Sequence, residues 1–295
     1  MKFTKMQGCS NDYVYVDCFG ETVSDMGHFA KLVSDRHTGI GSDGAIFICP
    51  AEGADAEMKM YNSDGSYSEM CGNGIRCVAK YLYDNCIVDR KDIDILSGGS
   101  IKRIHVETGP ERVNDLTGTT FSQREDGMAV NKARVDMGEP ILEPYKIPVM
   151  FSDGCDRVVS HDLYVDDSNY KVTCVSVGNP HCVVFVDDVK AVPIESLGPK
   201  FEQHVCFPNR INTEFVQIID RSTIRMRVWE RGAGETLACG TGACASAVAT
   251  ILNDLTEDRV TVRLRGGDLE IFWDRDGDNH VYMTGDAVTV FAGEI

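Results

Sequence analysis

The chain lacks long hydrophobic runs and is short of positive charge. No stretch approaches the roughly 18 consecutive apolar residues of a membrane-spanning helix. No apolar segment typical of a secretory signal follows the first lysines. The 29 lysines and arginines face 46 aspartates and glutamates, which leaves a net charge of −17. Because this charge repels phosphate backbones and anionic lipid, we expect no nucleic-acid and no membrane partner. The missing signal and membrane segments lead us to expect a cytoplasmic protein.

Low-complexity tracts and a disulfide framework are also missing. The twelve cysteines show no regular spacing. Several of them, including Cys49, Cys174 and Cys182, lie inside apolar, β-rich runs, which is typical of buried free thiols in a reducing compartment. With 43% hydrophobic and 25% charged residues the composition is that of a folded protein, and 295 residues are enough for two domains.

Common cofactor and metal motifs are absent. The segment Gly39–Gly44 resembles a dinucleotide fingerprint only loosely and opens no clear helix, and Gly232–Thr236 lacks the spacing and the lysine of a P-loop. Cys71 and Cys77 lie too far apart for the short spacing of structural zinc sites, and Cys239 and Cys244 are not accompanied by a His-x3-5-His pair. We expect neither a cofactor nor a metal.

What the chain does contain is a duplicated motif, Cys71–Gly74 and Cys239–Gly242, each placed before an apolar helix. A glycine-rich turn at a helix start directs backbone N–H groups and the positive end of the helix dipole at an anion. The same field lowers the pKa of a cysteine at that position. Two such sites could hold one carboxylate between two sulfurs.

Hydrophobic periodicity predicts one main helix in each half. The first follows Gly72 and ends near Asp84 and Asn85, and the second follows Gly240. Their expected apolar faces consist of Ile75, Val78, Ala79 and Leu82 in the first helix and of Cys244, Ala247, Val248 and Ile251 in the second.

Alternating and β-branched runs predict strands around these helices. We expect them at residues 13–16, 56–61 and 101–106, at 130–137, 158–165, 170–177 and 223–229, and as three more strands after the second helix, the last at 287–291. The polar stretch 108–127 marks a domain boundary. The expected fold is α+β (mixed α/β), with two pseudo-symmetric domains, residues 1–127 plus 284–295 and residues 128–283, each a strand-rich layer wrapped around its helix.

Two sulfurs at helix starts suit proton transfer at a carbon acid. If one cysteine is a thiolate and the other a thiol, the first removes a proton and the second supplies one from the opposite side, so that configuration inverts. The helix starts would stabilise the charge that develops on the substrate carboxylate. This chemistry needs no pyridoxal cofactor.

The residues resemble those of the diaminopimelate epimerase family. The matching segments run through nearly the whole chain: Gly8–Tyr13, Asp35–Asp43, Tyr61–Ser66, Glu69–Gly74, Gly178–His181, Arg210–Asn212, Trp229–Thr236 and Cys239–Gly242. The resemblance implies that the substrate, diaminopimelate, lies in the cleft between two domains, that the protein is a homodimer, and that it uses no cofactor.

The resemblance also implies roles for single residues. Cys71 and Cys239 match the acid and base pair, assisted by His181 and Glu230. Residues at the reacting end of the substrate would be Gly72, Asn73, Gly240 and Thr241. The distal amino acid group would be held by Asn11, Asn62, Asn179, Asn212 and Arg231, because amides and a planar guanidinium pair well with ammonium and carboxylate groups.

Two departures from the family pattern and two alternative functions stay open at this point. Gly44 stands where some members carry a glutamine, and Tyr13 replaces a residue that is often phenylalanine. One alternative is another cofactor-independent racemase of the same fold, acting on proline derivatives or histidine; such a substrate would leave Arg231 buried and unpaired, which is costly. The other is a thiol redox switch.

Overall fold

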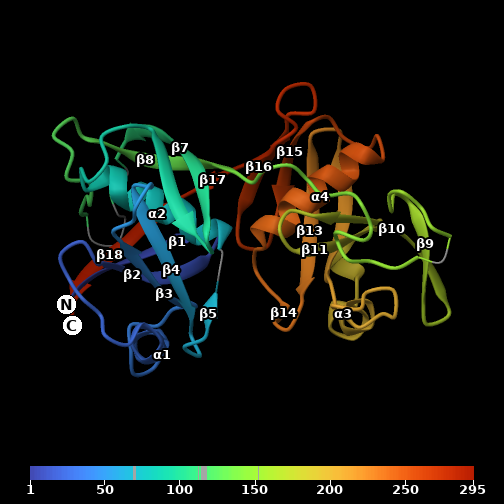
Figure 1. Ribbon diagram of the computed structural model, residues 1–295, viewed down its shortest axis with the longest axis horizontal. Helices are drawn as coiled ribbons and strands as arrows, with labels where there is room; N and C mark the ends of the chain where they lie inside the picture. The colour runs from blue at the N-terminus through green and yellow to red at the C-terminus, as the bar shows by residue number, and fades with distance from the viewer. Residues whose placement is uncertain (69–70, 112, 114–117, 152) are drawn as a thin grey trace. The chain divides into compact units, whose positions relative to one another are not determined.

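The computed structural model describes residues 1–68, 71–111, 113, 118–151 and 153–295 (Figure 1). Contacts between residues divide the chain into two compact units. The first unit comprises residues 1–136 and 284–295, and the second comprises residues 137–283. Among the described residues, no helix is both long and apolar enough to cross a membrane.

The first unit is rich in strands and has two helices among its described residues. The helices are α1 (Met26–Ser34) and α2 (Gly72–Asp84). The strands are β1 (Lys2–Gly8), β2 (Asn11–Asp17), β3 (Gly44–Cys49), β4 (Ala56–Asn62), β5 (Tyr67–Ser68), β6 (Asp92–Ser97), β7 (Ser100–Pro110), β8 (Met128–Asp136) and β18 (Val288–Glu294). The strand β17 (Val281–Asp286) pairs with β8 and runs across the division between the units.

The second unit has the same character. Its helices are α3 (Ile194–Glu202) and α4 (Gly240–Leu252), with a short 3-10 turn at Val189–Ala191. The strands are β9 (His161–Val165), β10 (Ser168–Ser176), β11 (Pro180–Phe185), β12 (Asn212–Asp220), β13 (Thr223–Glu230), β14 (Gly234–Glu235), β15 (Arg259–Arg263) and β16 (Asp268–Trp273).

The two units repeat one sequence of strand pairings. In the first, β1 and β2 are antiparallel, β2 and β3 are parallel with α1 as their connection, β3 and β4 are antiparallel, and β4 and β6 are parallel with α2 as their connection. In the second, β10, β11, α3, β12, β13, α4 and β15 take the same places in the same order. The duplication expected from the sequence is therefore present in the topology.

Each main helix is the centre of its unit. The helix α2 packs against β1, β2, β6, β7 and β8, and α4 packs against β10, β11, β12, β13, β15 and β16. In α2 the predicted apolar face is fully buried at Ile75, Val78, Ala79 and Leu82. In α4 nearly every residue is buried, and its alanines let strands approach on all sides, because a helix that is apolar all round belongs in a core.

The predicted fold class and main helices are confirmed, and several details differ. The helix α2 ends at Asp84 with Asn85 as its cap, as expected. After α4 there are four strands rather than three, and the strand predicted at 158–165 begins only at His161. Residues 128–136, expected in the second domain, form β8 of the first unit because they pair with β7.

The helices α1 and α3 were not predicted, since their sequence signals are short or unfavourable. In α1 the side chain of Asp25 caps the helix by accepting from the backbone N–H of His28 at 2.9 Å. The helix α3 contains Gly198 and Pro199, both poor helix formers. A Cβ at Gly198 would lie 2.4 Å from the Trp229 ring, so that the absence of a side chain lets α3 pack on β13.

This packing gives a prediction for stability. Gly198→Ala should destabilise the protein by about 1–3 kcal/mol, because overpacking against a rigid ring exceeds the gain in helix propensity of about 1 kcal/mol. Urea denaturation measures the change. The matched control is Gly20→Ala, where nothing lies within 4 Å of the added Cβ. Equal midpoints for the two variants would contradict the packing argument.

Candidate active site

The first half-site is built on the start of α2. Cys71 is the N-cap residue, with extended backbone angles of φ −139° and ψ 109°. Its Sγ accepts a hydrogen bond from the backbone N–H of Gly74 at 3.3 Å. A helix N-terminus leaves its first N–H groups without partners in the helix, so the sulfur occupies the place of a capping oxygen. This arrangement favours the thiolate.

Asn11, at the start of β2, faces the same sulfur. Its Oδ1 lies 3.4 Å from Cys71 Sγ, and its Nδ2 donates to Asp43 Oδ2 at 2.8 Å. Asp43 also accepts from the backbone N–H of Asp12 and from Arg36. The carboxylate therefore fixes the orientation of the Asn11 amide, with its oxygen toward Cys71.

Opposing effects act on the Cys71 thiol. Burial raises its pKa above the usual range, although the N–H of Gly74, the hydroxyl of Tyr13, the N–H of Asn73 and the Arg76 guanidinium partly offset this effect. The side-chain oxygen of Asn73 is itself engaged, because it accepts from Arg76 at 3.1 Å. Contact of Asn73 with a substrate would therefore use its backbone.

The second half-site repeats this geometry at the start of α4. Cys239 is the N-cap, with φ −124° and ψ 110°, and its Sγ accepts from the backbone N–H of Gly242 at 3.4 Å. The Thr241 hydroxyl lies 3.5 Å from the sulfur. Burial raises the pKa of the Cys239 thiol well above its usual range, and the carboxylates of Glu230 and Glu214 raise it further.

His181 lies on β11 and is fully buried. Its Nδ1 is 2.7 Å from Glu214 Oε1, and its Nε2 is 2.9 Å from Asn179 Oδ1. Glu230, at the end of β13, accepts instead from the Thr236 hydroxyl. The two polar neighbours predicted for the cysteine chemistry therefore have separate partners.

Asn212 connects β11, β12 and the loop after β13. Its Nδ2 donates to the backbone oxygen of Pro180 at 3.1 Å, and its Oδ1 accepts from the backbone N–H of Arg231 at 2.8 Å. The Arg231 side chain is exposed and donates to the Asn209 carbonyl at 3.0 Å.

Asn62 and Gly44 are paired residues of the antiparallel strands β4 and β3. Asn62 donates to Ser66 Oγ at 3.0 Å, within its own turn. Gly44 begins β3, and a Cβ there would lie 2.2 Å from the Tyr61 carbonyl oxygen. A glutamine would not fit at Gly44 without a backbone shift.

Sequence reasoning missed Glu214. It is fully buried on β12 and its pKa is raised by burial, while the adjacent His181 lowers it. The available signal was the period of two along the strand, which places Glu214 on the same face as Asn212.

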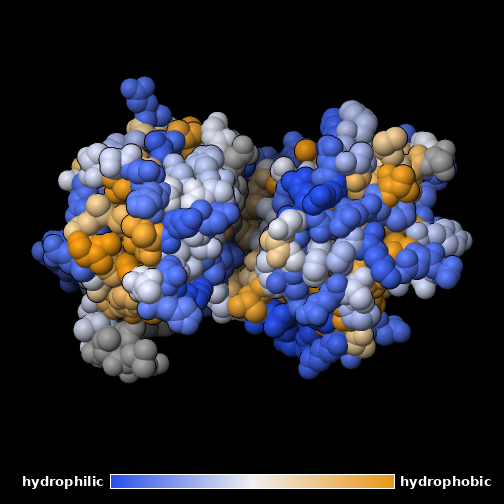
Figure 2. Space-filling model, turned by 90° about the horizontal axis from the view of Figure 1, so that it is seen from below, coloured by the Kyte–Doolittle hydropathy of each residue, from blue (hydrophilic) through white to orange (hydrophobic). Residues whose placement is uncertain are grey.

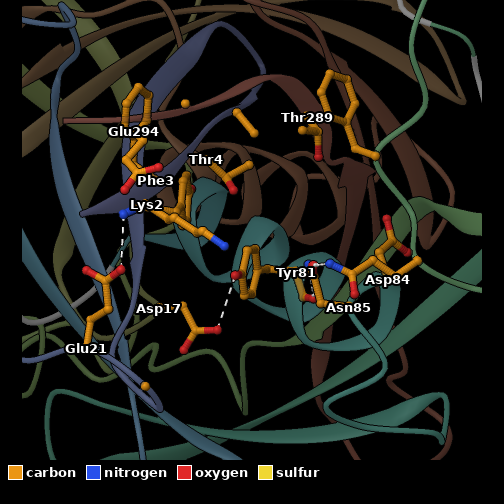
Figure 3. A pocket seen from close by; sticks show the side chains of 16 residues that line it. Lys2, Phe3, Thr4, Asp17, Glu21, Tyr81, Asp84, Asn85, Thr289 and Glu294 are labelled. Atoms are coloured by element: carbon orange, nitrogen blue, oxygen red, sulfur yellow. Dashed lines mark hydrogen bonds between the residues drawn. The ribbon is translucent and has the colours of Figure 1, made fainter.

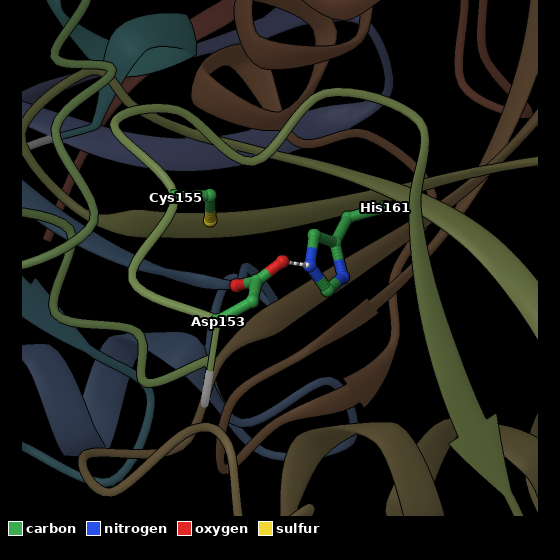
Figure 4. Close-up of side chains that lie close together, drawn as sticks. All are labelled: Asp153, Cys155 and His161. Atoms are coloured by element: carbon green, nitrogen blue, oxygen red, sulfur yellow. Dashed lines mark hydrogen bonds and ion pairs between the residues drawn. The ribbon is translucent and has the colours of Figure 1, made fainter.

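One cluster could offer ligands to a metal ion. The ligand atoms of Asp153, Cys155 and His161 lie within 4.8 Å of one another, which among the described residues is the single such group (Figure 4). Asp153 and His161 form an ion pair at 2.8 Å, and the second ring nitrogen of His161 is 2.9 Å from the Asp162 carbonyl oxygen. These two contacts account for the arrangement without an ion.

The first unit also contains a cavity of about 660 Å³ beside β1, β2, β18 and the end of α2 (Figure 3). In its wall the Tyr81 hydroxyl donates to Asp17 at 3.2 Å, and the backbone N–H of Lys2 donates to Glu21 at 3.1 Å. None of the predicted site residues lines this cavity.

A family model described as diaminopimelate epimerase matches residues 3–120 and 173–290, which include both half-sites. The chain belongs to the diaminopimelate epimerase family. Curated diaminopimelate epimerases from Acetivibrio thermocellus and Agathobacter rectalis are 52% and 50% identical; the alignments cover 100% of this chain and 98% and 99% of those proteins. The cluster at Asp153 lies between the two matched parts.

Solved structures support the fold. A PhzF-family phenazine biosynthesis protein from Bacillus anthracis matches with a TM-score of 0.66 at 16% identity, over 100% of this chain and 98% of that one. A hydroxyproline epimerase from Agrobacterium vitis matches with a TM-score of 0.65 at 12% identity, over 100% and 90%. The duplicated architecture of this diaminopimelate epimerase family member is thus a known one.

The orientation of Asn11 gives a second prediction. Asp43→Asn should lower kcat about tenfold, because an amide at this position no longer fixes the Asn11 oxygen toward Cys71 and a charged hydrogen bond is worth about 1.5–3 kcal/mol. Epimerase assays measure the change.

The matched control is Asp55→Asn. Asp55 also accepts from a backbone N–H, that of Asp94 at 2.9 Å, and from an arginine, Arg90 at 2.8 Å. A similar loss of kcat in both variants would show that the effect of Asp43 is one of stability.

Proposed function

We propose that this isomerase interconverts LL-diaminopimelate and meso-diaminopimelate through Cys71 and Cys239, without a cofactor. The family membership supports the substrate. One observation supports the mechanism. In both duplicated units a cysteine sulfur accepts a hydrogen bond from the third N–H group of the central helix. With diaminopimelate as its substrate, the reaction belongs to the synthesis of lysine and of cell-wall precursors.

In the proposed reaction both half-sites act on one α-carbon. The thiolate of one cysteine removes the α-proton, and the thiol of the other supplies a proton to the opposite face. The electron pair left on the α-carbon delocalises into the substrate carboxylate, where the N–H groups at Gly72, Asn73, Gly240 and Thr241 would stabilise it. The two sulfurs exchange protonation states, and the reverse reaction uses them in the opposite order.

The remaining predicted residues take supporting roles in this proposal. His181 and Glu230 tune the second half-site. Asn11, Asn62, Asn179, Asn212 and Arg231 hold the distal amino acid group. The exposed Arg231 guanidinium supports this role, because it is available for a bidentate pair with a carboxylate, and its backbone is held by Asn212.

The proposal extends to assembly and location. We infer a homodimer, as the family resemblance implies. Figure 2 shows hydrophobic residues gathered on one face of the first unit, and that unit exposes large apolar side chains, among them Phe19, Leu32, Tyr67, Ile101 and Phe291. All twelve cysteines are free thiols, which supports a reducing, cytoplasmic location.

The deciding experiment is proton NMR of the reduced enzyme with LL-diaminopimelate in D2O and no added cofactor. Loss of the α-proton signal together with appearance of the meso isomer is the expected result. If the α-proton persists while proline or histidine exchanges, the substrate assignment fails. If no amino acid exchanges, the carbon-acid mechanism fails with it.

The two cysteines provide the third prediction. Cys71→Ser and Cys239→Ser should each lower kcat by at least about 10²-fold, because a serine hydroxyl is a far weaker acid than a thiol and each sulfur transfers a proton in every turnover. Cys86→Ser, at an exposed free cysteine, and Cys174→Ser, on β10, are the controls. Four similar rates would refute the assignment.

A further inference from the structure

The two half-sites have equivalent positions that carry different residues. On the parallel strands β2 and β3, Tyr13 pairs with Gly44, and on β11 and β12, His181 pairs with Asn212. Tyr13 and His181 therefore correspond. Two residues further along β3 and β12, on the same faces, are Ile46 and Glu214.

Ile46 and Glu214 occupy the same place against the two central helices. A Cβ added at Gly74 would lie 2.6 Å from Ile46 Cδ1, and a Cβ added at Gly242 would lie 2.7 Å from Glu214 Oε1. These glycines are the residues whose backbone N–H groups donate to the sulfurs of Cys71 and Cys239. The third residue of each helix thus packs on an apolar side chain in one unit and on a carboxylate in the other.

Burial of the Glu214 carboxylate costs free energy of folding. It has no exposed surface, and Oε1 contacts His181 Nδ1 at 2.7 Å. The other oxygen, Oε2, is buried with no hydrogen-bond partner among the described residues. A carboxylate in such surroundings costs stability unless it is fully paired. Its presence where Ile46 fills the equivalent space points to a role in the chemistry of the site.

The charged groups with the largest effects on the two sulfurs differ in sign. Burial has the largest effect in raising the pKa of Cys239, and Glu230 on β13 and Glu214 on β12 raise it further, while Thr241 on its own helix lowers it. His181 on β11 faces Glu214 Oε1 through its Nδ1 at 2.7 Å.

Among the described residues, the groups with the largest effects on the Cys71 thiol are neutral or positive. Tyr13 on β2 and Arg76 on α2 both lower the pKa of this thiol. The amide oxygen of Asn11 accepts from the Cys71 thiol at 3.4 Å, and the Asp43 carboxylate accepts from the other end of the amide.

We propose that Glu214 is a positioning residue that makes the two half-sites unequal: it orients His181 with a proton on Nδ1, and its charge beside the start of α4 keeps the proton on Cys239, so that Cys71 carries the thiolate in the free enzyme. This inference rests on the proposed function, since it assigns the starting states of the two sulfurs. In this proposal the buried Glu214 carboxylate favours the protonated form of Cys239, and the Tyr13 hydroxyl favours the ionised form of Cys71.

The fourth prediction tests whether the two cysteines differ in protonation. The substrate-free protein is alkylated with iodoacetamide, and the peptides that contain each cysteine are measured by mass spectrometry. In the unaltered chain at pH 7, Cys71 should react about tenfold faster than Cys239, which corresponds to one pKa unit. In Glu214→Gln the Cys239 rate should rise about tenfold, with little change at Cys71. Both readouts need no turnover, so they remain decisive whatever the substrate is.

The 15N signals of the His181 ring supply a second readout that a merely structural role would not move. We expect a protonated Nδ1 in the unaltered chain and a changed protonation or tautomer in Glu214→Gln. The control is Asp84→Asn, which alters a buried carboxylate paired with Lys80 in the first unit. Faster alkylation of Cys239 than of Cys71 in the unaltered chain, or Cys239 rates that are equal in the control and in Glu214→Gln, would overturn the proposal.

Discussion

The structure depends on one interaction, the hydrogen bond from the third N–H of a central helix to the sulfur of its N-cap cysteine. This bond caps the start of the helix, sets the position of the sulfur and stabilises negative charge on it. The strands of each unit then hold the helix from several sides, so that its first turn is rigid. Burial would otherwise make both thiols inert, because it disfavours the charged form that reacts.

The sequence predicted what local chemistry determines. The apolar period of 72–84 and the glycines after each cysteine were sufficient for the two main helices and for both sulfurs at their starts. The helix α3 escaped because Gly198 and Pro199 oppose helix formation, and only contact with Trp229 explains the glycine. The strand β8 was assigned to the wrong side of the boundary because its partner β7 is what places it.

The site divides in the same way. Cysteines, asparagines and Arg231 are identifiable by motif, and the structure shows how backbone groups hold Asn212 and Asn11 in place. Glu214 belongs to no motif that spacing alone would single out. It becomes visible only when the registers of β2 with β3 and of β11 with β12 are compared, because its importance lies in the residue that the other unit has in its place.

Duplication explains why such a difference is needed. A reaction that inverts a carbon centre benefits from two similar helix starts, and a repeated unit supplies them. Two identical sites, however, would not determine which sulfur holds the proton when one thiol and one thiolate are present. Unequal charges in a duplicated geometry determine it. Placing a carboxylate against one helix and isoleucine against the other does this at a single pair of positions, without disturbing either cap.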